Sequence, residues 1–229
     1  LFFFSSLGKI LRIGLPAGVQ SAVFSVSNIV IQSAINSLGK VVMAASSAAF
    51  NIEIFAYDVM NSFSQTCTTF VGQNYGAGQL KRCRKTLFLC LIEDAVASAA
   101  AIGIVLLSGR FLLSIFNNDP AVIDLGYVRL VTIFFAYIFS MLYEVMSGYL
   151  RGFGISLTPA ILTTLGVCGV RIVWIAAVFP KSRTFEPIMT AYPVSLSLTA
   201  VLIFIALLIA HPSRRYASKF VTQKATDNN

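Results

Sequence analysis

Charged residues and histidine are scarce in this sequence. Asp, Glu, Lys and Arg make up 11% of its 229 residues, against about 25% in an average soluble domain. The single histidine, His211, cannot supply a His-based metal site or a catalytic triad. The four cysteines form no Cys-x-x-Cys pair and read as small buried hydrophobic residues. These shortages exclude a soluble enzyme, a disordered chain and a disulfide-rich secreted module.

Long apolar runs fill most of the chain, and 57% of the residues are hydrophobic. A transmembrane helix needs about 20 apolar residues to cross ~30 Å of hydrocarbon. The sequence therefore predicts an all-α integral membrane protein, a bundle of six transmembrane helices. The predicted spans cover residues 13–37, 41–72, 86–108, 122–150, 159–180 and 188–210, with a connection over 1–12 and a polar tail over 211–229. The first residue is not Met, so we expect a piece of a longer polypeptide.

The net charge of +8 comes from basic residues that gather on one side of the predicted membrane. That side holds Lys9, Arg12, Lys81, Arg82, Arg84, Lys85, Arg151, Arg214, Arg215, Lys219 and Lys224, and the other holds Lys40, Arg110, Lys181 and Arg183. Cytoplasmic loops carry such an excess, so both termini are predicted to be cytoplasmic. No basic run has the aromatic interleaving of a nucleic-acid surface, and no nucleic-acid partner is expected.

Polar residues within three of the spans repeat with the period of a helix. At 100° per residue, each set falls within an arc of about 80°. The sets are Ser21, Ser25, Asn28, Gln32 and Asn36; Glu53, Tyr57, Asn61, Ser64 and Thr68; and Tyr137, Ser140, Glu144, Ser147 and Arg151. Polar stripes cannot face lipid cheaply, so we expect the three to converge on an internal cavity. Its predicted substrate-contacting residues are Asn28, Gln32, Tyr57, Asn61, Tyr137 and Ser140. For any single Ser or Asn, a hydrogen bond between helices is the competing interpretation.

Two carboxylic acids lie near the middle of the membrane on these stripes, Glu53 and Glu144. Burial favours the protonated form of a carboxyl group, which can then exchange its proton for a cation. We therefore predict that both acids couple transport to H⁺ or Na⁺, with Na⁺ binding at this pair as one possibility and no other cofactor. Asp58 lies off the stripe. Glu93 and Asp94, close to the basic segment 81–85, are either structural or functional. Arg171 is expected to pair with an acid or with helix carbonyls.

Three motifs in order resemble those of the multidrug and toxic compound extrusion (MATE) family. They are Gly14-Leu15-Pro16 at the first span, Val71-Gly72-Gln73-Asn74-Tyr75-Gly76-Ala77-Gly78 after the second, and Gly148-Tyr149-Leu150-Arg151-Gly152-Phe153-Gly154 after the fourth. Their structural residues would be Pro16, Gly72, Gln73, Gly76, Arg151 and Gly152. The resemblance implies the C-terminal six-helix lobe of a twelve-helix transporter in the cell membrane. It also implies an N-terminal lobe as partner, in the same chain or a separate one, and export of organic cations in exchange for H⁺ or Na⁺.

The sequence departs from the family at its best-described cation site. Many relatives with a sodium site carry Glu eight positions after the proline of the first motif and Asp eight before the first glycine of the third, whereas this chain has Phe24 and Ser140. A flippase for lipid-linked oligosaccharides from the same superfamily is one alternative function, and a six-span channel is another. An intramembrane enzyme would need a nucleophile and base or a metal cluster, which the sequence does not offer.

Overall fold

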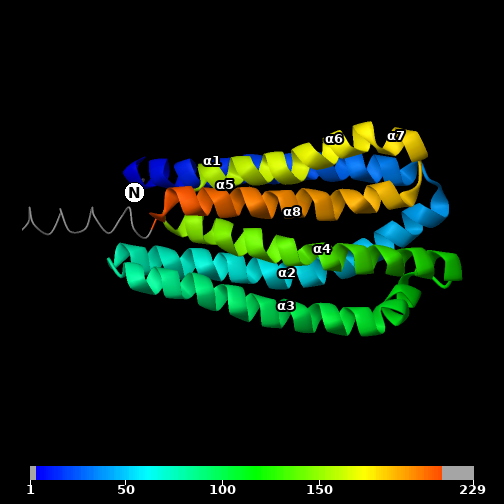
Figure 1. The fold of residues 1–229 in the computed structure, drawn as a ribbon, viewed down its shortest axis with the longest axis horizontal. Helices are drawn as coiled ribbons and strands as arrows, with labels where there is room; N and C mark the ends of the chain where they lie inside the picture. The colour runs from blue at the N-terminus through cyan, green and yellow to red at the C-terminus, as the bar shows by residue number, and fades with distance from the viewer. Residues whose placement is uncertain (1–3, 213–229) are drawn as a thin grey trace, which may run out of the picture.

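The computed structural model describes residues 4–212, and that part of the chain is a bundle of long helices lying side by side (Figure 1). The elements are α1 (Phe4–Asn36), α2 (Lys40–Gly76), α3 (Leu80–Phe116), α4 (Pro120–Gly152), α5 (Leu157–Thr163), the π-helical segment η1 (Thr164–Gly169), α6 (Val170–Ala177), α7 (Phe179–Ser182) and α8 (Phe185–Ala210). The predicted fold class, an all-helical membrane bundle, is confirmed.

Within residues 4–212, five helical stretches are long and apolar enough to cross a membrane. They are Gly18–Asn36, α3, α4, Leu157–Ser182 and α8. The remaining long helix, α2, has the polar content noted in the sequence, and it packs against both α3 and α4. The helices extend beyond the predicted spans, and α1 is helical from Phe4. A helix satisfies its own backbone hydrogen bonds, so it can continue from the hydrocarbon into the polar interface.

The turns between helices lie in or near the gaps between the predicted spans. Gly39 and Gly78 adopt φ values of 101° and 71°, a conformation that glycine reaches without a steric cost. At the start of α4, an Asp119 carboxylate oxygen accepts a hydrogen bond from the Ala121 amide at 2.9 Å. Pro120 follows at the first helical position, where its missing N–H costs nothing. Each connection is therefore short enough to keep consecutive helices antiparallel.

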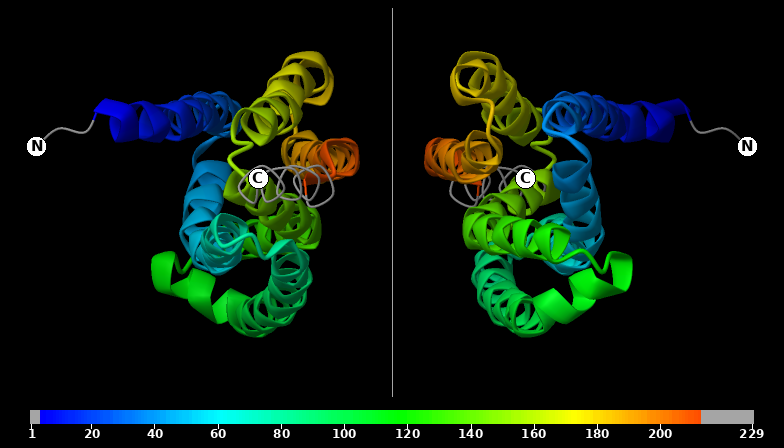
Figure 2. Two further views of the ribbon diagram at one scale, coloured as in Figure 1. Left: turned by 90° about the vertical axis from the view of Figure 1, so that its left-hand side faces the viewer. Right: turned by 90° about the vertical axis from the view of Figure 1, so that its right-hand side faces the viewer.

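The bundle has two parts that share α4 and α8 as their boundary. Helices α2, α3 and α4 pack closely together, and α8 packs along α4 (Figure 1). On the other side, α1 contacts the α5–η1–α6 rod and makes fewer contacts with α2 and α8. Figure 2 shows α1 at the edge of the bundle, with its N-terminal part extending away from the other helices. One face of α1 is consequently left open.

Small residues allow α2 and α4 to approach closely. A Cβ atom added to Gly152 would lie 2.6 Å from the Val71 Cβ, and one added to Gly148 would collide with the Ser64 carbonyl oxygen. Small residues have this use in membrane bundles, where packing replaces the hydrophobic effect between helices. The glycines of the third motif therefore fix the distance between α2 and α4.

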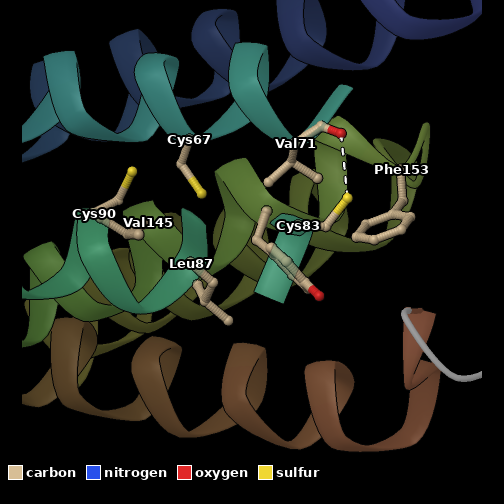
Figure 3. Packing of buried hydrophobic residues seen from close by; sticks show 8 residues of the cluster. Cys67, Val71, Cys83, Leu87, Cys90, Val145 and Phe153 are labelled. Carbon is tan, nitrogen blue, oxygen red and sulfur yellow. Dashed lines mark hydrogen bonds between the residues drawn. The ribbon is translucent and has the colours of Figure 1, made fainter. Parts of the chain in front are cut away.

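The cysteines contribute to the core, as the sequence predicted. All four are free and buried. Cys67 and Cys90 lie between α2 and α3 with Val145 of α4 beside them, and the Cys83 thiol donates a 3.7 Å hydrogen bond to the Val71 carbonyl (Figure 3). This cluster holds the three helices together at the end where α2 meets α3.

The fifth predicted span is interrupted by a turn of π-helix. Thr164–Gly169 forms η1 between α5 and α6. A Cβ added to Gly166 of this segment would collide with the Thr199 side chain of α8. Single π-turns often mark functional sites or irregular packing within helices. Here the widened turn includes a glycine that packs against Thr199 of α8.

Candidate functional site

The polar stripes of α2 and α4 face each other along their shared interface. The Ser64 hydroxyl donates a 2.8 Å hydrogen bond to the Glu144 backbone carbonyl, and the Thr68 hydroxyl donates one of 3.1 Å to the Gly148 carbonyl. Two helical turns before Ser64, Tyr57 reaches the Glu144 side chain. The structure thus brings together two of the three predicted stripes.

Glu144 lies at the centre of this interface and is only 7% exposed. Its carboxylate accepts a hydrogen bond from the Tyr57 hydroxyl at 3.5 Å, and the Arg151 guanidinium lies 3.5 Å from its other oxygen. Both distances are at the long end for such contacts. A buried carboxyl group with long contacts keeps capacity to bind a proton or a small cation.

Glu53 has a different environment, because Arg129 occupies its carboxylate. The Arg129 Nε and Nη2 atoms donate hydrogen bonds to the two Glu53 oxygens at 2.7 and 3.0 Å. Both residues are 3% exposed. A bidentate pair of this kind is among the strongest polar contacts in proteins. The coupling role predicted for Glu53 stays a prediction, and it would require this ion pair to open.

Arg171 is held by a hydroxyl group and an aromatic ring. Its Nε donates a 3.0 Å hydrogen bond to Ser195, and its guanidinium carbon lies 4.3 Å from the centre of the Tyr192 ring. The Arg129 guanidinium lies 5.7 Å from the same ring. The acid or carbonyl partner expected for Arg171 is not among the contacts of the described chain. Tyr192 of α8 instead lies near two cations, an arrangement that cation–π attraction favours.

The stripe of α1 does not join the other two stripes in this chain. Its members Ser21, Ser25, Asn28, Gln32 and Asn36 are all exposed. Gln32 donates a hydrogen bond to Asn36 of the same stripe at 2.8 Å. The apolar side of α1, with Ile31 and Ile35, packs in a cluster with Ile175 and Ile188. Burial of that apolar side turns the polar side outward.

The remaining predicted cavity residues lie along the interface of α2 and α4. Asn61 is half-buried. The Tyr137 ring lies 6.4 Å from that of Tyr57. Ser140 is buried and donates a 3.4 Å hydrogen bond to the Tyr143 hydroxyl. These residues line a packed interface, so their contact with a substrate stays a prediction.

A second polar face of α2 was not singled out from the sequence. Its exposed members fall within an arc of about 60°: Ser47, Asn51, Asp58, Ser62, Gln65 and Thr69. Asp58 makes no ion pair with any of the described side chains, and Phe55, 72% exposed, lies at the edge of the face. The helical period of α2 is the signal in the sequence that reveals this face, on a different side of the helix from the stripe through Glu53. A polar face with one carboxylate and an aromatic edge is suited to a lipophilic cation.

Asp94 of α3 is a further buried acid. It is fully buried, and one carboxylate oxygen accepts a 2.7 Å hydrogen bond from the Ser98 hydroxyl. The other oxygen has no hydrogen-bond partner among the described residues. The bundle of α2, α3 and α4 therefore buries a carboxyl group whose hydrogen-bonding capacity is only partly used by the described residues.

The motif residues mark helix ends and close contacts. Gly76 is the last residue of α2, Gln73 is exposed one turn earlier, and a Cβ on Gly72 would lie 3.6 Å from the Gly152 carbonyl oxygen. Arg151 reaches Glu144 from the last turn of α4. Pro16 lies within α1, and its side chain is outside the described ones.

Comparison with known proteins gives consistent matches. The family model described as MatE matches residues 16–176. The chain is 26% identical over 168 residues to "Probable multidrug resistance protein NorM" of Thermotoga maritima, a match covering 73% of this chain and 36% of that protein. It is 28% identical over 176 residues to "Multidrug resistance protein PmpM" of Pseudomonas aeruginosa, a match covering 72% of this chain and 35% of that protein.

Solved structures agree with the fold. A multidrug resistance MATE family transporter in an outward-facing conformation superposes with a TM-score of 0.76 at 18% identity, covering 88% of this chain and 44% of that one. A MATE structure in a bent conformation superposes with a TM-score of 0.79 at 17% sequence identity. That match covers 98% of this chain and 49% of the other. The chain thus spans less than half the length of each of these relatives and structures.

Proposed function

Since the chain belongs to the MatE family, we propose that it forms one lobe of a multidrug efflux transporter and exchanges organic cations for H⁺ or Na⁺. The family consists of membrane transporters, and the chain is not an enzyme. The chain itself is a multi-pass membrane protein. We further propose the cell membrane as its location, with both ends of this segment on the cytoplasmic side.

The exposed polar faces of α1 and α2 support a second lobe as partner. Asp58 lies near the middle of the 37-residue helix α2. A charged side chain at that depth costs about 2.5–3.5 kcal/mol when it faces lipid. If a second lobe with a polar surface faces Asp58 across water, the charge no longer faces lipid and this free-energy cost is removed. Because the relatives are more than twice as long as their matched part, the other lobe is the partner that fits, in the same chain or a separate one.

The environment of Glu144 is the observation that carries the coupling proposal. Its carboxylate is buried between α2 and α4, and its contacts with Tyr57 and Arg151 are both 3.5 Å long. Binding of a proton or Na⁺ there would weaken the attraction to Arg151, since the carboxylate charge is neutralised. Glu53 is the less favourable of the two predicted acids, because binding an ion would break its bidentate contact with Arg129.

Substrate binding would use the exposed face of α2 and the stripe of α1. Asp58 supplies a negative charge and Phe55 an aromatic surface on α2. Asn28 and Gln32 of α1 offer hydrogen-bonding groups on a helix that adjoins α2. A cavity between two lobes, lined in this way, would bind a flat organic cation by charge and by contact with its ring system.

Reconstitution of the two-lobed transporter tests the coupling proposal. We expect Glu144→Gln to abolish export of an ethidium-like cation driven by an H⁺ or Na⁺ gradient, because the amide carries no exchangeable charge. Asp124→Asn is the matched control: it makes the same change on α4, at an exposed ion pair with Arg110. Gradient-driven transport that persists in Glu144→Gln would disprove the proposed role. A thermal melt in detergent verifies that both variants fold.

The flippase alternative has less support. The similar proteins named above are called multidrug resistance proteins, and a flippase cavity should present cations to a pyrophosphate. The exposed polar face of α2 presents Asp58 instead. Assays with lipid-linked substrates in the same vesicles would separate the two functions.

A further inference from the structure

An open groove lies at the end of the membrane bundle where the chain turns from α2 into α3. Its volume is about 660 Å³. Gln73 contributes to its lining from α2, and Arg82, Lys85 and Thr86 contribute from the first two turns of α3. Phe70 and Leu89 form its apolar edge on the side of the membrane interior. The groove thus has a basic, polar end and an apolar end.

The two basic side chains in the groove are available to a ligand. Arg82 and Lys85 are exposed. Neither makes an ion pair or a side-chain hydrogen bond with any side chain that the structure describes. No Asp or Glu occurs between Gly76 and Ile92, so no acid of their own segment neutralises them. The groove therefore attracts an anionic group.

The apolar edge of the groove continues along the outer face of α3. Phe88, Leu89, Ile92 and Val96 are all exposed there, at 44–67%. A helix that is long enough to span a membrane and exposes such a face meets acyl chains. A ligand in the groove can consequently contact hydrocarbon and two positive charges at once.

We propose that this groove binds an anionic phospholipid, with the headgroup phosphate against Arg82 and Lys85 and an acyl chain against Phe70 and Leu89. Guanidinium and ammonium groups suit a phosphate, and basic pockets beside transmembrane helices bind acidic headgroups. A free phosphate ion would use the two cations but gain nothing from the apolar edge. The site lies apart from Glu144 and Asp58, and it does not depend on the proposed transport reaction.

Native mass spectrometry of the two-lobed protein in detergent tests the site. Phosphatidylglycerol and phosphatidylcholine with matched acyl chains are added in turn, and the retained lipid is counted. Arg82→Gln/Lys85→Gln removes the two charges of the groove. Lys81→Gln/Arg84→Gln is the matched control, because it removes the same charge from the same helical turns outside the groove lining.

We expect wild type and control to retain phosphatidylglycerol in preference to phosphatidylcholine. Each basic residue near an anionic lipid contributes about fivefold in affinity, so the groove variant should bind phosphatidylglycerol roughly thirtyfold more weakly. Equal losses in the groove variant and the control would overturn the proposal, as would equal retention of the two lipids by wild type.

A second variant distinguishes the lipid from a soluble anion. Phe70→Ser/Leu89→Ser keeps both cations and removes the apolar edge. We expect it to lose phosphatidylglycerol while its thermal shift with inorganic phosphate is unchanged. If inorganic phosphate stabilises wild type and phosphatidylglycerol binds this variant as well as it binds wild type, the groove is a phosphate site and the lipid proposal is wrong.

Discussion

Arg129 of α4 donates two hydrogen bonds to the Glu53 carboxylate of α2, at 2.7 and 3.0 Å, in a part of the bundle where both residues are 3% exposed. This contact distinguishes Glu53 from Glu144, although the same coupling role was predicted for both acids from the sequence. Glu53 is neutralised by a fixed partner, whereas the Glu144 carboxylate lies 3.5 Å from the Tyr57 hydroxyl and 3.5 Å from the Arg151 guanidinium. A structural role therefore suits Glu53 better, and an ion-binding role suits Glu144.

The pair of Glu53 and Arg129 should show the energetics of a buried ion pair. Glu53→Gln or Arg129→Gln alone leaves one charge buried without its partner, and we expect each to lower stability by about 3–5 kcal/mol. The double variant Glu53→Gln/Arg129→Gln buries no charge and should recover most of this loss. Thermal or denaturant unfolding in detergent measures the cycle. Single variants as stable as wild type would show that the two groups are solvated or paired elsewhere.

The close contact of α2 and α4 at Gly148 predicts a steric effect. Gly148→Ala places a methyl group against the Ser64 carbonyl oxygen and should force the helices apart. We expect a loss of about 1–3 kcal/mol in the free energy of unfolding, as for overpacked cores. Gly103→Ala is the control, since Gly103 lies within α3 and a Cβ there meets no atom within 4 Å. That variant should be neutral or more stable by up to about 1 kcal/mol.

Hydropathy and turn residues were sufficient to predict the helical bundle. The apolar runs located the long helices, and Gly39, Gly78 and Asp119–Pro120 lie in gaps between the predicted spans. The π-turn η1 was not foreseen, because no local residue pattern distinguishes it from an α-helical turn. Its Gly166 packs against Thr199 of another helix, a contact between residues distant in sequence.

The candidate site was harder to predict than the fold, because helical periodicity gives the direction of a side chain but not its partner. The period placed Tyr57 and Glu144 on facing stripes, and the structure brings them into contact. It gave no sign that Arg129 would reach Glu53, 76 residues away in sequence. The outward orientation of the α1 stripe depends on which side of α1 the neighbouring helices cover, which is a tertiary property.

Asp94 offers a test of an incompletely satisfied buried acid. Its second carboxylate oxygen has no hydrogen-bond partner in the described part of the chain. Asp94→Asn removes the possibility of a buried charge and keeps the acceptor for the Ser98 hydroxyl. We expect the variant to be at least as stable as wild type in detergent, and its stability to vary less with pH. A loss of more than about 1 kcal/mol would mean that the Asp94 carboxylate has a favourable charged partner.

The exposed face of α2 leads to a prediction about substrate selectivity. Asp58 lies on this face without an ion-pair partner among the described side chains, so in the two-lobed transporter its charge would be available to a cationic substrate. Asp58→Asn should raise the KM for a monovalent organic cation roughly fivefold, which corresponds to about 1 kcal/mol for a solvated ion pair. A neutral substrate of similar shape should be exported as by wild type.

Glu93→Gln is the matched control for Asp58→Asn, because Glu93 is also an exposed acid but lies on α3, next to the apolar side chain of Ile92. The control should leave both KM values unchanged, and neither variant should alter the thermal melt, since both acids lie on the surface of the lobe. An equal effect of Asp58→Asn on charged and neutral substrates would mean that Asp58 shapes the cavity rather than binding the cation. If Glu93→Gln weakened cation export as much as Asp58→Asn, the total charge of the lobe would set selectivity, and the polar face of α2 would not be the substrate-binding surface.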